Sequence, residues 1–270
     1  MNHAESMADH VLDRLGIINS EDLRLLNEIV YERGLIIREC PMTGSEARLL
    51  IGPGRPIISI SSSLMINPQR RRFSIAHELG HFELHRGKTP FQYCTPRDIL
   101  ESQNNSTEND EIEANQFASA FLLPARFVEK PFSENEPSFP LISEWAKRLE
   151  TSLTSTAIRF TTFTKEPVAV VYCEKGVIKY FQPSKEFDGL GVFLDVGNYV
   201  KINTGAKSLF NGGENLNQWQ EVRAAYWFRE DRDAFDRNDT IREWSIKMPN
   251  YEGVLSLIWV KDPLGQKNGW

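Results

Sequence analysis

The feature that most constrains this chain is an H-E-x-x-H segment, His77-Glu78-Leu79-Gly80-His81. In an α-helix, residues i and i+4 lie on one face with Cβ atoms about 5–6 Å apart, so two imidazoles can close on one metal ion. Glu78 follows His77 directly and can reach a water held by that ion. The pattern therefore predicts a zinc site with a general base on the same helix. The alternative is a helix whose two histidines pack inside the protein or point into solvent.

The residues around this segment favour a helix. Ala76 and Leu79 are good helix formers, and Ser74 is the predicted N-cap. Gly80 costs helical stability, so we expect it to mark the close approach of another backbone. His85 lies eight residues after His77, about 12 Å along the helix axis. It is therefore predicted to pack beside the site rather than to bind the same ion.

A second helix is predicted from Glu111 to Leu123, because apolar residues recur there at helical spacing and Pro124 follows. Glu113 lies one turn before Phe117, within or at the edge of the apolar face. A buried carboxylate needs a partner, and zinc would be that partner, so Glu113 is the predicted third metal ligand. The alternative for Glu113 is a salt bridge or a favourable position near the helix N-terminus. Glu111 lies about 200° round the helix and is predicted to be solvated.

Composition narrows the class of protein. A hydrophobic content of 40% and a charged content of 25% fit a soluble globular chain. The three cysteines are far apart in the sequence, so we expect no disulfide scaffold and a reducing, cytoplasmic location. No window approaches the ~20 apolar residues of a membrane span. The net charge of −6 argues against a generally basic nucleic-acid surface. The run Arg70-Arg71-Arg72 is interpreted as solvated, with an electropositive rim for an acidic partner as the alternative.

The first half also contains shorter elements, which we predict from periodicity and turn residues. A polar segment between Glu101 and Asp110 is interpreted as a mobile loop. A small sheet beside the metal helix is expected, since ligands on rigid elements keep their geometry. The predicted helices are Met7 to Leu15 and Asp22 to Glu32, and the predicted strands are Leu35 to Arg38, Glu46 to Ile51 and Pro56 to Ser61.

The second half changes pattern at Pro167. Before it, two short helices (141–149 and 155–162) form a helix-turn-helix-like unit whose near-neutral charge favours packing or protein binding over DNA binding. After it, apolar residues alternate with period two, and Glu174-Lys175-Gly176 indicates a hairpin. The strands predicted after Pro167 are Val168 to Cys173, Val177 to Phe181, Gly189 to Asp195, Tyr199 to Ile202, Glu221 to Phe228, Thr240 to Met248 and Gly253 to Val260.

The predicted fold class is α+β. The predicted division is a zincin-like metallopeptidase domain of a small sheet plus the H-E-x-x-H helix over residues 1–136, a helix-turn-helix-like linker unit over 137–165, and a C-terminal α+β sheet domain over 166–270. The last domain is expected to act as a sensor or to bind a partner.

Two segments together resemble a known family. Arg72-Phe-Ser-Ile-Ala-His-Glu-Leu-Gly-His81, followed by Glu111-Ile-Glu-Ala-Asn-Gln-Phe-Ala118 and Leu122-Leu-Pro124, resembles the ImmA/IrrE family of zinc metallopeptidases, with a matched core from Gly34 to Pro124. The resemblance implies a gluzincin-like site in which His77 and His81 bind zinc and the Glu of E-A-N, Glu113, is the third ligand. It also implies that Glu78 is the catalytic base and that the fourth position is open to water.

The resemblance also implies a function. Known members cleave repressor proteins in phage and mobile-element regulation or in a DNA-damage response, and others accompany toxin–antitoxin-like pairs. We therefore expect a zinc-dependent endopeptidase in which Glu78 activates a zinc-bound water to cut a cognate repressor or antitoxin-like protein. Tyr93 or His85 are the candidate donors to the oxyanion. Many members carry a helix-turn-helix domain before the peptidase, whereas this chain has two short helices there, so the regulator would be a separate protein.

The alternative function is a regulatory protein- or DNA-binding module with a structural or inactive zinc site, such as a toxin–antitoxin component. DNA binding is the less expected of its two modes because of the acidic charge balance.

Overall fold

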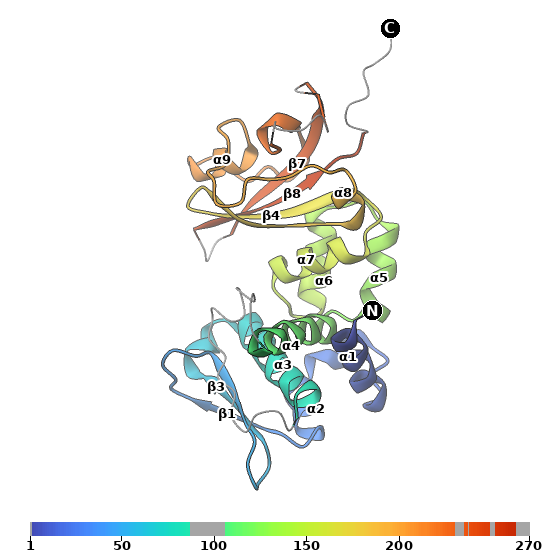
Figure 1. The fold of residues 1–270 in the computed structure, drawn as a ribbon, viewed down its shortest axis with the longest axis vertical. Coiled ribbons are helices and arrows are strands. Elements are labelled where there is room, and N and C mark those ends of the chain that lie inside the picture. Colours follow the sequence, from blue (N-terminus) through green and yellow to red (C-terminus); the bar gives the residue numbers. More distant parts are fainter. Residues whose placement is uncertain (1, 87–105, 230–234, 237, 249–251, 263–270) are drawn as a thin grey trace. The chain divides into compact units, whose positions relative to one another are not determined.

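A computed structural model describes residues 2–86, 106–229, 235–236, 238–248 and 252–262 of the chain. The chain forms two compact units, and Figure 1 colours their elements along the sequence. The N-terminal unit comprises Met1–Phe127 and Ser143–Thr156, and the C-terminal unit comprises Val128–Ile142 and Ala157–Trp270. The fold is mixed α and β, as the sequence predicts. Among the described residues, no helix is both long enough and apolar enough to span a membrane.

A three-stranded sheet supports the N-terminal unit. Its order is β1 (Ile36–Cys40), β3 (Ile57–Ser61), β2 (Ala47–Leu50), with β3 parallel to β1 and antiparallel to β2. The central strand β3 is buried, and its Ile58 and Ile60 are fully covered. The three predicted strands are confirmed to within two residues at each end. From β3 the chain passes through a 3-10 turn, Ser62–Ile66, directly into the helix that contains the H-E-x-x-H segment.

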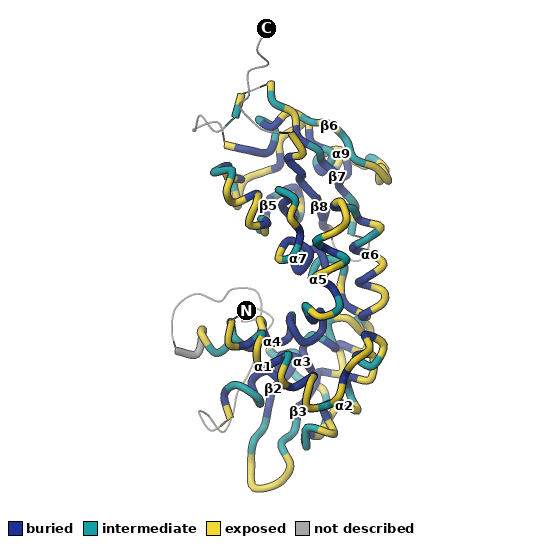
Figure 2. Tube along the Cα trace, turned by 90° about the vertical axis from the view of Figure 1, so that its right-hand side faces the viewer, coloured by how far each residue is buried: buried dark blue, intermediate teal, exposed yellow. Residues whose placement is uncertain are grey.

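The H-E-x-x-H segment lies on α3 (Pro68–Leu84). Asn67 caps this helix, because its side-chain oxygen accepts a hydrogen bond from the Arg70 N–H at 3.1 Å, and Pro68 occupies the first position, where no N–H is needed. The predicted cap Ser74 is therefore wrong: it lies two turns inside the helix and is fully buried. The middle of α3 is covered on all sides, as the dark blue segment in Figure 2 shows.

Three helices complete the core of the N-terminal unit. α4 (Ser106–Leu122) lies along α3, and α1 (His3–Arg14) lies along α4. Because α4 begins at Ser106, the predicted loop from Glu101 to Asp110 is wrong over its second half, and residues 101–105 lie outside the described residues. α1 begins at a capping box between Asn2 and Glu5 and buries an apolar stripe of Ala4, Ala8, Val11 and Leu12. α2 (Leu26–Glu32) follows a 3-10 turn, Ser20–Arg24.

Gly80 sets the distance between α3 and α4. A Cβ added there would lie 3.2 Å from the carbonyl oxygen of Ala114 and 3.0 Å from Cδ1 of Phe117. Both contacts are shorter than ordinary van der Waals separations, and one of them is with backbone. The expected close approach of a second backbone at this glycine is confirmed.

Gly80→Ala should therefore destabilise the protein even though alanine favours helix. The gain in helix propensity is about 1 kcal/mol, whereas overpacking a tight contact costs about 1–3 kcal/mol and would displace α4 from α3. Urea unfolding should show a lower free energy of unfolding, and the affinity for a metal at the histidine pair should fall as well. Gly52→Ala is the matched control, because nothing lies within 4 Å of a Cβ there. A Gly80→Ala variant as stable as wild type would contradict this account of α3–α4 packing.

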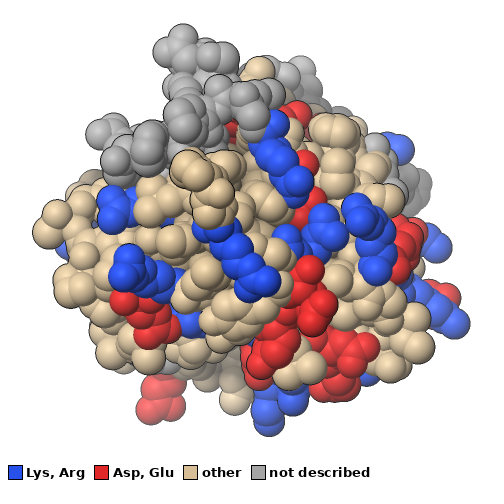
Figure 3. Space-filling view, turned by 90° about the horizontal axis from the view of Figure 1, so that it is seen from below, with Lys and Arg blue, Asp and Glu red and all other residues tan. Residues whose placement is uncertain are grey.

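The arginine run at the start of α3 is held inside its own unit. Arg70 pairs with Glu46 at 2.6 Å, and Arg71 pairs with Glu39 at 2.7 Å. Arg72 is buried and donates to two backbone carbonyls in the turn before α2. The interpretation as a solvated run is therefore wrong for Arg72, and the electropositive rim is neutralised by carboxylates. The face in Figure 3 shows basic and acidic side chains interspersed, without one continuous basic patch.

The C-terminal unit is built on a five-stranded antiparallel sheet. Its order is β5 (Val177–Pro183), β4 (Val168–Glu174), β8 (Gly253–Trp259), β7 (Thr240–Met248), β6 (Gln220–Arg223). The predicted hairpin is confirmed, with Lys175 and Gly176 at φ 51° and 79° in its turn. The two long predicted strands near the C-terminus are confirmed as β7 and β8. The predicted strand from Glu221 to Phe228 is only four residues long, because a 3-10 turn replaces its second half.

Two predicted strands are wrong. The segments 189–195 and 199–202 contribute only isolated bridges, Leu194 with Phe228 and Tyr199 with Val177. The chain between β5 and β6 instead contains α8 (Lys185–Asp188) and α9 (Gly205–Phe210).

Three helices occupy the chain between α4 and β4. These are α5 (Ala125–Glu134), α6 (Phe139–Arg148) and α7 (Leu153–Phe163). α5 is absent from the sequence prediction, whereas α6 and α7 were expected. A turn with Glu150 at φ 53° joins α6 to α7. The assignment of 137–165 as a separate unit, and its proposed roles, stay predictions.

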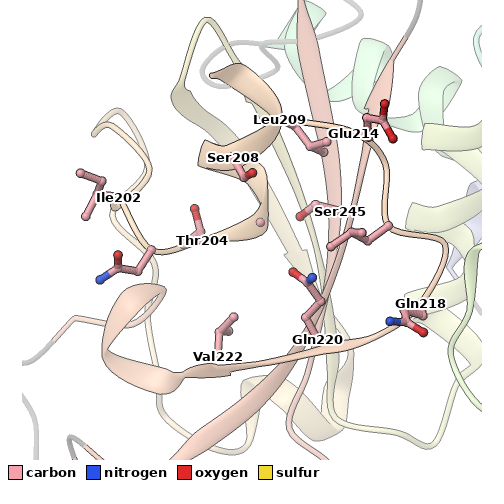
Figure 4. Close-up of a pocket in the computed structure, with 12 residues that line it drawn as sticks. Ile202, Thr204, Ser208, Leu209, Glu214, Gln218, Gln220, Val222 and Ser245 are labelled. Atoms are coloured by element: carbon pink, nitrogen blue, oxygen red, sulfur yellow. The ribbon is translucent and has the colours of Figure 1, made fainter. Parts of the chain in front are cut away.

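A buried carboxylate organises one side of the C-terminal sheet. Glu243 on β7 accepts hydrogen bonds from the N–H groups of Gly205 and Ala206, the indole of Trp227 and the hydroxyl of Ser245, at 2.6–3.0 Å. These bonds fix the start of α9 against the sheet. Beside them lies an open pocket of about 310 Å³, shown in Figure 4. Hydroxyl and amide side chains line much of it, including Thr204, Ser208, Gln218 and Gln220.

Candidate metal centre

The two histidines of the H-E-x-x-H segment point at one place. Their Nε2 atoms are 3.0 Å apart, and their rings are nearly perpendicular at 82°. Both residues are fully buried. This is the geometry that i, i+4 spacing on α3 permits, and the predicted convergence of His77 and His81 is present in the structure.

A carboxylate from α4 completes the group, and it belongs to Glu111. One oxygen of Glu111 lies 3.2 Å from Nε2 of His77, and the other lies 3.2 Å from Nε2 of His81. Ligands of a tetrahedral zinc ion at about 2.0–2.1 Å from the metal stand about 3.4 Å from one another. The three donors therefore have the spacing of a zinc site, and two histidines with one glutamate form a known catalytic donor set.

Glu113 does not join the pair, so the structure corrects the predicted third ligand. Its carboxylate lies 2.9 Å from Nε2 of His85, and its side chain is 36% exposed. The side chain of Glu111, which the sequence analysis placed in solvent, is only 15% exposed. That Glu111 binds a metal ion in this position is a proposal, which is argued below.

The reason lies in which face of α4 meets α3. The two helices run in opposite directions: His77 contacts Asn115, and His81 contacts Glu111. The contacting face therefore follows Glu111, Ala114, Asn115 and Ala118, at spacings of three, four and seven. The prediction took its face from Phe117, which packs against Gly80 of α3, whereas Glu111 and Asn115 are the residues that contact the histidines. The small residues Ala114 and Ala118 were the better guide, since small side chains allow the helices to approach.

Asn115 is a functional candidate that the sequence analysis missed. Its side-chain oxygen lies 3.0 Å from Nδ1 of His77. With the proton on Nδ1, His77 donates to this oxygen and keeps the lone pair of Nε2 facing Glu111. The sequence does contain a signal for this role, because Asn115 follows Glu111 by one helical turn and so lies on the same face of α4.

The electrostatics of the cluster keep Glu111 ionised. Burial alone would raise the pKa of this carboxyl, but hydrogen bonds and charge from both histidines hold it well below its usual range. Burial lowers the pKa of His81. For His77, burial is outweighed by the hydrogen bond to Glu111 and by the charge of Glu78, so the pKa is raised. An ionised carboxylate beside two imidazoles is the state that binds a divalent metal.

Glu78 and the remaining candidates surround this cluster. Glu78 is fully buried on α3, and its charge reaches His77. His85 contacts His81 at 3.1 Å through Nδ1, on the ring edge away from the converging Nε2 atoms. As expected, it packs beside the site, and this position does not suit it as a donor to a reacting group. Tyr93, the other predicted donor, lies outside the described residues.

Comparisons with known proteins place a peptidase family over this part of the chain. Residues 32–161 match Peptidase_M78, described as the IrrE N-terminal-like domain. The radiation response metalloprotease IrrE of Deinococcus radiodurans is 28% identical over 130 residues, which cover 46% of this chain and 36% of that protein. Its namesake from Deinococcus deserti is 28% identical over 127 residues, covering 45% of this chain and 41% of that protein. The matches thus span less than half the length of these relatives.

One solved structure extends the likeness beyond this domain. A transcriptional regulator from Mycobacterium tuberculosis superposes with a TM-score of 0.58 at 15% identity, covering 96% of this chain and 77% of its own. At this identity the likeness concerns the fold alone.

Proposed function

We propose that this chain is a zinc-dependent endopeptidase that cleaves a separate regulatory protein, because residues 32–161 match the IrrE N-terminal-like domain of the Peptidase_M78 family. His77, His81 and Glu111 would hold the zinc ion, and Glu78 would be the general base. The observation that supports the proposal most directly is the position of the Glu111 carboxylate. One of its oxygens lies 3.2 Å from Nε2 of His77, and the other lies 3.2 Å from Nε2 of His81. The match to this family supports a metallopeptidase, and the donor set favours zinc.

Each side chain has a defined task in this proposal. A zinc ion at the cluster supplies a water of lowered pKa and a Lewis acid for the scissile carbonyl. Glu78 accepts the proton of the attacking water and returns it to the leaving amine. Asn115 holds the ring of His77 in the orientation that keeps Nε2 available. Burial of both histidines excludes bulk water from the donor atoms, which strengthens every charge interaction there.

The substrate class rests on similarity rather than on geometry. Two relatives are named radiation response metalloproteases, and the family resemblance implies cleavage of repressor-type regulators. Arg70 and Arg71 on α3 form ion pairs with glutamates, which argues against DNA as the main partner of the surface around them. We therefore propose a protein substrate such as a repressor or antitoxin, encoded apart from this chain.

Incubation of the zinc-loaded protein with the regulator encoded beside it tests this function. Mass spectrometry should find one discrete cut, which a chelator abolishes and added zinc restores. Glu129→Gln, an exposed change on α5, should cut at the wild-type rate and serves as control. If the regulator stays intact while the protein carries zinc, the binding-module alternative gains support. Salt-dependent DNA binding that survives metal removal would favour that alternative directly.

A further inference from the structure

A second group of possible metal ligands adjoins the first. Its members are His85, Asp110 and Glu113, whose donor atoms also lie within 4.8 Å of one another. His85 is buried, and the two carboxylates come from α4. This group can act in two ways: it can hold a second ion, or it can support the first site through hydrogen bonds.

We propose that Glu113 and His85 form a hydrogen-bonded relay that positions His81 and strengthens its bond to the metal. The inference rests on the proposed zinc site of His77, His81 and Glu111. In it, Glu113 is a positioning residue that acts through His85 rather than a metal ligand.

The direction of the hydrogen bonds follows from proton counting. A histidine that binds metal through Nε2 carries its proton on Nδ1. Nδ1 of His81 lies 3.1 Å from Nδ1 of His85, so His81 donates and His85 accepts. A neutral His85 then carries its proton on Nε2. That nitrogen lies 2.9 Å from Oε2 of Glu113, which accepts the second hydrogen bond.

The same counting argues against a second metal ion. An ion on His85 would need the lone pair of Nε2, while Nδ1 of the same ring already accepts from His81. Both ring nitrogens would then lack protons, or the bond between His81 and His85 would break. Occupation of the first site therefore commits the second group to the relay. Asp110, whose Oδ1 is 3.4 Å from Nε2 of His85, adds negative charge beside it but is too distant for a strong hydrogen bond.

The relay treats the two histidine ligands differently. His77 is supported by the neutral amide of Asn115, whereas His81 is supported by a carboxylate acting through a second imidazole. A carboxylate behind a ligand histidine fixes the ring and raises its basicity, and loss of such partners costs about 10–100-fold in metal affinity.

Zinc affinity, measured by competition with a chromophoric chelator, tests the relay. His85→Phe keeps the ring volume but cannot accept from His81, and it should weaken zinc binding about 10–100-fold. Glu113→Gln should weaken it less, by about tenfold at most, because the amide oxygen can still accept. The double variant should bind zinc no more weakly than His85→Phe alone, since Glu113 acts only through His85. The visible spectrum of the Co²⁺-loaded protein should shift in each of these variants.

Asp110→Asn is the matched control. This change removes a ligand that a second ion would need and leaves the relay intact. The zinc affinity should therefore stay within about threefold of wild type, a smaller change than the about 10–100-fold expected when a supporting partner is lost. Wild type and all variants should bind one zinc per chain. Two ions per chain, with the second lost in Asp110→Asn, would overturn the relay. The relay would also be overturned if the losses of zinc affinity in His85→Phe and Glu113→Gln added up in the double variant.

Failure of the relay is distinguishable from failure of the proposed function. If wild type binds zinc tightly and the Glu113 and His85 variants bind it equally well, only the relay is wrong. If wild type binds no zinc, the proposed metal centre itself is wrong and the relay falls with it. Glu113→Gln is isosteric at a partly exposed position, so it keeps the test decisive if His85→Phe does not fold.

Discussion

Glu111→Gln should strip the protein of stably bound metal, whereas Glu113→Gln should retain it. The two carboxylate oxygens of Glu111 lie 3.2 Å from Nε2 of His77 and of His81, one oxygen at each histidine. The amide of glutamine carries no charge and is a much weaker metal ligand. Loss of a direct ligand should lower the metal affinity by more than the about 100-fold that is the most expected for loss of a supporting partner. Metal content after dialysis, together with chelator competition, measures the difference.

The comparison between the two glutamates decides the third ligand. They are two residues apart on one helix, so each substitution controls for the other in charge and in position along α4. A variant at Glu113 that loses its metal while the Glu111 variant keeps it would restore the assignment made from sequence. Circular dichroism should show both variants folded, because neither change alters side-chain volume appreciably.

Glu78→Gln should keep zinc and lose proteolysis. Glutamine has nearly the same shape but cannot accept a proton, and general acid–base catalysis is worth about 10²–10⁴-fold in rate. Glu78 is not among the three donors of the metal group, so the zinc affinity should stay close to that of wild type. Single-turnover cleavage of the regulator, followed by mass spectrometry, gives the rate.

Two results would contradict this role for Glu78. Cleavage at the wild-type rate would remove it as the base. Loss of zinc together with activity would show that it supports the metal site instead. Glu129→Gln again controls for the loss of one negative charge, since it is exposed on α5.

The sequence predicted the helix of the H-E-x-x-H segment well because its signal is local. Spacing within one helix brings His77 and His81 together regardless of the rest of the fold. The third ligand depends on how two helices meet, which the pattern within α4 does not determine. Glu111 lies in the stripe of α4 that contacts α3, close to Ala114, whose carbonyl approaches Gly80, and this docking brings Glu111 rather than Glu113 to the histidine pair. The large apolar residues of α4 do not distinguish the two glutamates, because Phe117 packs against Gly80 as well.

The C-terminal half shows a similar limit. The hairpin and the strands β7 and β8 were predicted because alternation and turn residues agree there. Val192 and Leu194 also alternate, and both are buried in the core of this unit. Their backbone makes only an isolated bridge, so the alternation reflects side chains entering a core from an irregular segment. Period-two burial is therefore necessary for a half-buried strand but does not establish one.

The division of the proposed metal donors between α3 and α4 has a consequence for when the protein could act. Two donors come from one helix and the third from another that begins more than twenty residues later in the chain. In the proposed enzyme, no single stretch of polypeptide would carry all three donors, so a chain emerging from the ribosome would gain hydrolytic activity only when the two helices dock. Folding and the gain of activity would then be one event, which would keep an unfinished chain from cutting other proteins in the cell.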